Sequence, residues 1–261
     1  MRLILIICSL GFATPDLQEA ARFNAKTKLA GEKLFQYDMA SAYGSDIMTE
    51  NWKHYDKYDL NGYVTIRDGK TCRIVYTGEY KGKPSAYYEV DLRKELGKSD
   101  TAFENNPPRE LLGLERSMYG AERTANNAEI KLNCSANYNK ILVPNDSGWS
   151  VYFLAATTQQ GKVVVGGHYR IDIDSTGGRI IRTEQFTNSC LEMPLSSDDE
   201  GNPIMFITHL RSKFPNEVEY YLMLLHNLKL YVAIDKDLWF LTKDVIVYLG
   251  DVDKMKEKKK W

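Results

Sequence analysis

The side chains best suited to chemistry lie between residues 166 and 174, where the sequence reads GGHYRIDID. Successive side chains of a β-strand point to opposite faces of its sheet. A strand here would therefore separate its polar residues from its apolar residues. The polar set is His168, Arg170, Asp172 and Asp174, and the apolar set is Tyr169, Ile171 and Ile173. We expect the apolar set to face the core and the polar set to face solvent.

Two further charged residues, Arg182 and Glu184, lie on the strand that is expected to return after the turn at residues 176–178. On the same face they would join His168 and Arg170 in a binding site of mixed charge. Any half-buried antiparallel strand also presents such a face to water. Both interpretations stay open on the sequence alone.

A histidine beside carboxylates also has the groups that acid–base chemistry needs. In this alternative the protein is a hydrolase, with or without a metal ion: Asp172 orients the imidazole, His168 acts as the base and His209 completes the site. None of the four histidines has the HxH, HxxxH or HExxH spacing of a local metal site. The sequence also lacks phosphate-binding and dinucleotide-binding glycine motifs. It therefore predicts no metal and no cofactor, and it favours a protein that is not an enzyme.

The first thirteen residues, MRLILIICSLGFA, have the order of a secretory signal peptide. Arg2 precedes an apolar run over residues 3–10, and Gly11 and Ala13 are the small residues before a cleavage point after Ala13. We expect residues 1–13 to be removed and the mature protein to be periplasmic or secreted. The alternative is a buried N-terminal strand. No run reaches the ~20 apolar residues of a membrane span, so no transmembrane span is expected.

Loss of the leader would remove Cys8 and leave three cysteines. Cys134 and Cys190 lie in polar, turn-rich surroundings, whereas Cys72 lies in the strand-like run TCRIVY and suits a small buried position. An odd count in an oxidising compartment permits one bridge, and we expect it between Cys134 and Cys190. The alternative, a thiol–imidazole pair of Cys190 with His168 or His209, requires a free Cys190.

Local patterns predict the elements that position these residues. A helix is expected from Pro15, with an interruption at Gly31, and another over residues 109–126. The Asp68-Gly69 pair predicts a hairpin within a three-strand meander over residues 61–90, and the polar segment 94–108 is expected to be a loop. Later strands are expected at 149–156, 163–165, 168–174, 179–186, 204–208, 217–224, 228–234, 238–241 and 245–249.

Runs of strands with two or three helices predict an α+β fold in which antiparallel sheet predominates. We expect one domain over residues 14–261, with two packed halves, 14–100 and 101–261, as the alternative. The hydrophobic content of 43% excludes a disordered chain. The net charge of -1 provides no basic excess for contact with phosphates, which argues against a nucleic-acid partner.

Two segments carry a family pattern, GWSVYFLAATTQQGKVVVGGHYRIDIDSTGGRIIRTEQFTNSCLEMP and ITHLRSKFPNEVEYYLMLLHNLKLYV. The pattern is a W-x-VY strand, a GGHYR strand, a glycine turn and a serine–cysteine ending, followed by a TH–PxE strand pair. In these features the chain resembles a family of uncharacterised bacterial exported proteins over roughly residues 109–249. The resemblance implies a periplasmic or secreted location and no established activity. The chain departs from the family at Glu219, where a histidine is usual.

These observations favour a non-enzymatic exported protein of the cell envelope that binds an unidentified protein or small ligand. An inhibitor or immunity-type role is one form of this hypothesis, and no residue singles it out. The hydrolase with His168, Asp172 and His209 stays the alternative.

Overall fold

The computed structural model describes residues 17–69, 71–93, 100–131, 134, 137–157, 159–187, 189–198, 200–209 and 211–258. Within these residues the chain has four α-helices and mainly antiparallel sheets, which confirms the predicted α+β class. The predicted leader at residues 1–13 lies outside the described residues. Among the described residues, no helix combines the length and the apolar character that a membrane crossing requires.

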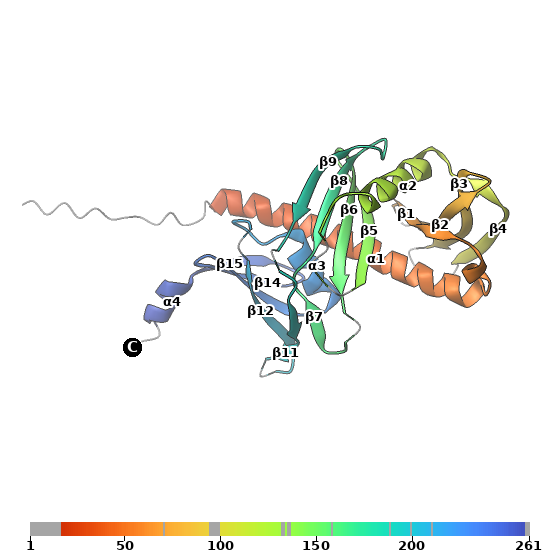
Figure 1. The fold of residues 1–261 in the computed structure, drawn as a ribbon. Helices are drawn as coiled ribbons and strands as arrows, with labels where there is room; N and C mark the ends of the chain where they lie inside the picture. The colour runs from red at the N-terminus through yellow and green to blue at the C-terminus, as the bar shows by residue number, and fades with distance from the viewer. Residues whose placement is uncertain are drawn as a thin grey trace, which may run out of the picture.

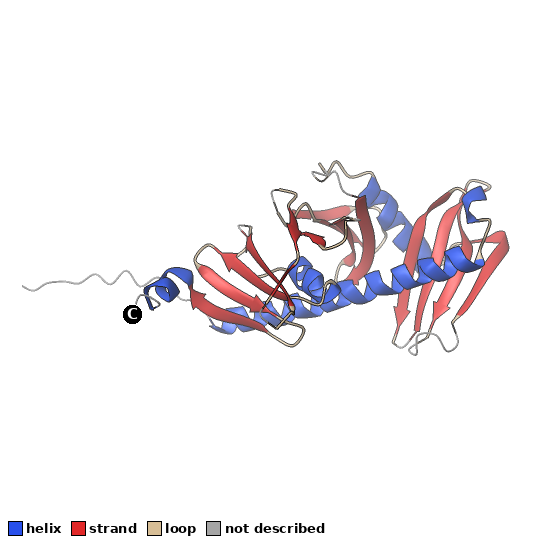
Figure 2. Ribbon diagram, turned by 90° about the horizontal axis from the view of Figure 1, so that it is seen from below, coloured by secondary structure: helices blue, strands red, loops and turns tan. Residues whose placement is uncertain are grey.

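The longest element is helix α1 (Leu17–Asn51), which runs along the molecule with the sheets beside it (Figure 1 and Figure 2). The expected interruption at Gly31 is wrong. A Cβ atom at Gly31 would lie 2.8 Å from the carbonyl oxygen of Glu217 and 2.9 Å from Cβ of Tyr220. Both residues belong to helix α3 (Glu217–Leu225). The glycine therefore permits a close helix–helix approach and does not end α1.

After the short 3-10 helix η1 (Tyr55–Lys57), four strands form the first sheet in the order β1-β2-β3-β4. They are β1 (Leu60–Asp68), β2 (Thr71–Tyr80), β3 (Lys83–Leu92) and β4 (Thr101–Glu110). The predicted three-strand meander is confirmed, and its two turns have positive φ at Gly69 (56°) and at Lys81 (52°) and Gly82 (74°).

The expected loop over residues 94–108 is wrong from residue 101 onward, because residues 101–108 belong to β4. This strand is polar and largely exposed, and it pairs with β3 alone. An edge strand tolerates prolines and polar residues because one of its sides forms no ladder. Since β4 pairs with β3, the first sheet contains residues on both sides of the predicted boundary at 100/101.

The second sheet is antiparallel throughout and has the order β5-β6-β8-β9. Its strands are β5 (Asn137–Asn145), β6 (Gly148–Ala156), β8 (Tyr169–Asp174) and β9 (Ile180–Gln185). One face packs on helix α2 (Gly113–Asn126), and the other faces α1 and α3. Helix α2 begins later than expected, because Arg109 and Glu110 belong to β4. The Glu115 carboxylate accepts a 2.8 Å hydrogen bond from the Leu112 N–H and so caps its first turn.

The third sheet has the order β11-β12-β13-β14-β15. Its strands are β11 (Ser196–Ser197), β12 (Pro203–His209), β13 (Lys229–Ile234), β14 (Asp237–Leu241) and β15 (Ile246–Asp251). Strands β12 and β13 are parallel, and the other neighbours are antiparallel. Strand β7 (Lys162–Val164) pairs separately with β10 (Glu192–Pro194), and helix α4 (Val252–Lys258) follows β15.

The strand expected over residues 217–224 is wrong, because these residues form α3, the crossover that a parallel strand pair needs. The Asn216 side chain accepts hydrogen bonds from the N–H groups of Val218 and Glu219 at 3.0 and 3.1 Å. The Glu219 carboxylate accepts from the Asn216 N–H at 2.8 Å. This reciprocal capping box starts the helix at a point where the apolar run alone resembles a strand.

Candidate functional site

The alternation predicted for the GGHYRIDID segment is confirmed in β8. Tyr169, Ile171 and Ile173 are buried against α2 and the rest of its cluster. Arg170 and Asp172 point to the opposite face, where they are partly buried. The structure corrects the expectation that this face is open to solvent, because α1 and α3 lie over it.

Arg170 is the centre of an ion-pair cluster on this face. Its Nη2 lies 2.6 Å from Glu184 of β9, its Nε lies 3.2 Å from Asp172, and its Nη1 bonds to Glu217 of α3. The Arg170 side chain is only 16% exposed. Burial acts to lower its pKa, but the carboxylates around it, Glu217 first, raise the pKa above its ordinary value. Arg170 therefore stays charged and joins α3 to the second sheet.

The cluster continues through neutral groups and one more cation. Ser150 donates to Asp172 at 2.6 Å and accepts from Asn145 at 2.8 Å. Arg182 lies 2.9 Å from Glu184. Three of the four predicted binding residues, Arg170, Arg182 and Glu184, are thus together.

Burial raises the pKa of Glu217, which also accepts a 3.3 Å bond from the Tyr152 hydroxyl.

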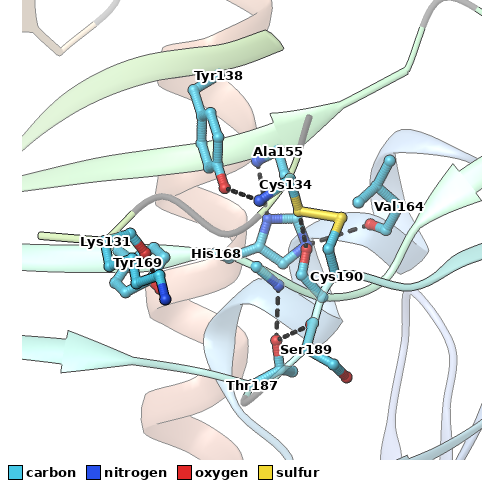
Figure 3. The surroundings of a disulfide bond; sticks show 12 residues. Lys131, Cys134, Tyr138, Ala155, Val164, His168, Tyr169, Thr187, Ser189 and Cys190 are labelled. Atoms are coloured by element: carbon cyan, nitrogen blue, oxygen red, sulfur yellow. Dashed lines mark hydrogen bonds between the residues drawn. A yellow bond between two sulfur atoms is a disulfide. The ribbon is translucent and has the colours of Figure 1, made fainter. Parts of the chain in front are cut away.

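His168 does not join this cluster, and its expected place on a solvent-facing strand is wrong. The residue is 1% exposed and precedes β8. Its Nδ1 accepts a 3.1 Å bond from the Ala155 N–H, so its Nε2 carries the proton donated to the Val164 carbonyl at 3.2 Å (Figure 3). Burial lowers the pKa of His168 to about 4. The imidazole is therefore neutral and has no nitrogen left for Asp172 or a substrate.

Next to His168 lies the predicted disulfide, which is confirmed between Cys134 and Cys190, with a Cα–Cα distance of 5.2 Å (Figure 3). The bond removes the thiol that a Cys190–histidine pair would need. Cys72 is the free cysteine among the described residues, and it is buried, as expected. Burial raises the pKa of its thiol to about 11, which keeps it protonated and unreactive.

His209, the other histidine of the hydrolase alternative, ends β12, and its side chain lies outside the described part. Asp174 lies at the far end of β8, where its carboxylate accepts bonds from the Gly178 and Arg179 N–H groups at 3.2 and 3.3 Å. It therefore shapes the turn between β8 and β9. Within the described residues, no three His, Cys, Asp or Glu side chains gather in a way that could hold a metal ion.

A groove of about 510 Å³ opens beside the Arg170 cluster. The second sheet forms one wall, with Ser150, Arg170, Asp172, Ile181 and Arg182. Helix α1 forms the other wall, with Lys26, Leu29, Ala30 and Lys33. This helical wall was not predicted from the sequence. The four α1 residues are spaced i, i+3, i+4 and i+7, which places them on one face of a helix, but the local sequence does not show what that face packs against.

The two lysines of the α1 wall differ in how firmly they are held. The Lys33 Nζ donates to the Pro144 carbonyl at 2.5 Å, and burial lowers the pKa of Lys33. Lys26 is exposed and forms no ion pair with any described residue. Leu29 and Ile181 are 69% and 47% exposed, one on each wall. The groove therefore has a fixed polar floor and an open rim that combines apolar side chains with the cations Lys26 and Arg182 and the exposed carboxylate of Asp146.

No family model, no curated protein and no solved structure matches this chain. The resemblance to bacterial exported proteins therefore stays a prediction that rests on the sequence pattern.

Proposed function

We propose that the protein is an exported, non-enzymatic binding protein of the cell envelope, and that the groove between α1 and the second sheet is its binding site. The observation that carries this proposal is the exposure of Leu29 and Ile181 across from one another in a groove that also contains Lys26 and Arg182. Exposed apolar side chains grouped in a concave, charged site are typical of interaction surfaces.

The chemistry of the rim indicates the partner. Arg170 is neutralised by three carboxylates, whereas Lys26 and the largely exposed Arg182 can each meet a further negative charge. A protein segment with apolar side chains and flanking acidic residues fits both features. An inhibitor or immunity-type role is one form of this proposal.

Several features support a periplasmic or secreted location. The disulfide is compatible with an oxidising, extracytoplasmic compartment. The leader-like residues 1–13 and the resemblance to exported proteins point the same way. The hydrolase alternative receives no support from His168, because both of its ring nitrogens bond to main-chain groups.

Site-specific photo-cross-linking in the native host tests the proposal. A photoreactive amino acid at Leu29 or Ile181 should give the same adduct, because the two positions face one groove. Met39 of α1 and Phe103 of β4 are exposed hydrophobic residues outside the groove and are the matched controls. The adduct should be lost on Lys26→Glu or Arg182→Glu. Equal adducts from the control positions, or none from the groove, would contradict the proposal.

A further inference from the structure

A second cavity, of about 370 Å³, lies where α1, β1, α2 and β5 meet. It shares no lining residue with the groove described above. Each of the four elements contributes an ionisable side chain to its wall: Asp38, Tyr63, Glu122 and Lys140. Ala42 and Asn139 are exposed at its edge, so the cavity is open to solvent there.

The two carboxylates in this cavity are buried but incompletely paired. Asp38 is 9% exposed and Glu122 is 7% exposed. Asp38 Oδ2 accepts a 2.7 Å bond from the Tyr221 hydroxyl, and Oδ1 has no hydrogen-bond partner among the described residues. Glu122 Oε1 lies 3.4 Å from the Lys140 ammonium, and Oε2 likewise has no partner there. Neither oxygen is fully enclosed by protein atoms, so both can accept hydrogen bonds from a ligand in the cavity.

The other described groups of the cavity wall provide no further positive charge for Asp38 Oδ1 and Glu122 Oε2. The Tyr63 hydroxyl donates to the Lys140 carbonyl at 3.3 Å, and burial raises the pKa of Tyr63 to about 12, so it stays neutral. Burial also raises the pKa of Asp38 and Glu122, as expected when an ionised carboxylate lacks full compensation. Two carboxylates facing one ammonium leave the cavity with an excess of negative charge.

Gly62 lies directly against the Glu122 carboxylate on the cavity wall. It has a φ of 147°, and a Cβ atom there would meet the Glu122 carboxylate, 2.8 Å from Oε2. A side chain at this position would displace the carboxylate, whose Oε1 is the nearest atom. The glycine therefore allows Glu122 to keep its position on the cavity wall.

We propose that this cavity binds a small organic cation whose primary ammonium group donates hydrogen bonds to Asp38 and Glu122. An ammonium has three donors for the free oxygens, and the rings of Tyr63 and Tyr138 on the wall suit a cation. A hard metal ion needs six or more oxygen ligands, more than the free oxygens of Asp38 and Glu122 supply. A water molecule occupies ~30 Å³, so the cavity has room for a ligand of roughly ten non-hydrogen atoms.

Calorimetric titration of the mature protein with matched pairs of probes tests the proposal. Glucosamine and 1,4-diaminobutane carry the ammonium group, and glucose and 1,4-butanediol are their neutral counterparts. At neutral pH and low salt, at least one amine should bind with a Kd below about 1 mM, and its counterpart at least about tenfold more weakly.

Isosteric variants locate the binding. Asp38→Asn and Glu122→Gln should each weaken amine binding about tenfold or more, because each removes a charged acceptor. Asp46→Asn and Glu50→Gln, at exposed positions of the same helix, should leave it unchanged. Circular dichroism checks that each variant folds. If a variant does not fold, the comparison of amine with neutral counterpart in the wild type still decides.

Two results would overturn the proposal: no amine binds more tightly than its neutral counterpart, or binding survives both Asp38→Asn and Glu122→Gln in folded protein. Because the cavity and the groove share no residues, neither result bears on the binding function proposed for the groove.

Discussion

Replacing Arg170 by methionine should destabilise the protein severely. Methionine keeps an apolar stem near the Phe186 ring, whose centroid lies 5.9 Å from the guanidinium carbon, but it removes the charge. Asp172, Glu184 and Glu217 would then share the site without their common cation. Breaking a buried ion pair by removing one partner costs about 3–5 kcal/mol. We therefore expect Arg170→Met to lower the free energy of unfolding by about that amount at neutral pH.

The matched control is Arg182→Met. Arg182 lies beside the same Glu184, but its side chain is 58% exposed, and an exposed ion pair contributes about 1 kcal/mol or less. Urea unfolding followed by circular dichroism measures both variants. If Arg170→Met costs no more than Arg182→Met, the cluster does not hold α3 to the second sheet as the structure indicates.

The loss of stability caused by Arg170→Met should depend on pH. The pKa of Glu217 is already raised by burial, and loss of Arg170 should raise it further. A carboxyl whose folded pKa is raised stabilises the fold below its unfolded pKa of about 4.3, and that contribution is lost as pH rises through the folded pKa. The penalty for Arg170→Met should therefore shrink as pH falls from 7 towards about 4. A penalty independent of pH would refute this account.

Three further predictions concern stability. Replacing Cys134 and Cys190 by serine should cost about 4 kcal/mol on the chain-entropy model for a separation of 56 residues, measured by urea unfolding. The pKa of His168 is lowered to about 4 in the folded protein, against about 6.5 in the unfolded chain. The neutral, buried imidazole therefore stabilises the folded state above pH 6.5, and this stabilisation is lost as pH falls towards 4. His168→Gln should flatten the stability profile over that range in a pH series of melts. Gly31→Ala should destabilise by about 1–3 kcal/mol despite the helix propensity of alanine, because its Cβ meets Glu217 and Tyr220, and thermal melting tests it.

Each of these has a control and a contrary result. Buried, free Cys72 changed to serine tests the effect of losing a cysteine outside the bridge, and an equal loss there would argue against a specific role for the disulfide. A profile for His168→Gln as steep as that of the wild type would mean that other groups titrate. A neutral or stabilising Gly31→Ala would mean that α1 and α3 can separate at no cost.

Local pattern predicts part of this molecule well. The alternation in β8, the Gly69 turn and the α+β class follow from periodicity and turn chemistry, which act over a few residues. The predicted disulfide between Cys134 and Cys190 is also confirmed, because polar turn residues place each cysteine at the end of an element, where its partner can reach it. The family resemblance and the binding function remain predictions.

The failures concern features that depend on distant partners. His168 belongs to the polar set by parity, but Ala155 and Val164 enclose it, and no local pattern shows that. Strand β4 pairs with β3 despite a polar sequence. The apolar run 217–224 suits a strand by composition, and the capping box of Asn216 with Glu219 is the local signal for α3 that was missed.

Helix α1 has a consequence for the order in which this protein can be completed. Its first turns bond to residues near the other end of the chain: Asn24 donates to the Ile246 carbonyl at 3.2 Å and Lys28 to the Asp244 carbonyl at 2.8 Å, across 222 and 216 positions. During synthesis from the N-terminus, the first helix is made before its partners exist. The C-terminal part of α1 can be covered early, because Met48 packs in one cluster with Ile74 and Val90 of the first sheet. The N-terminal part cannot complete its packing until the last strands have been made.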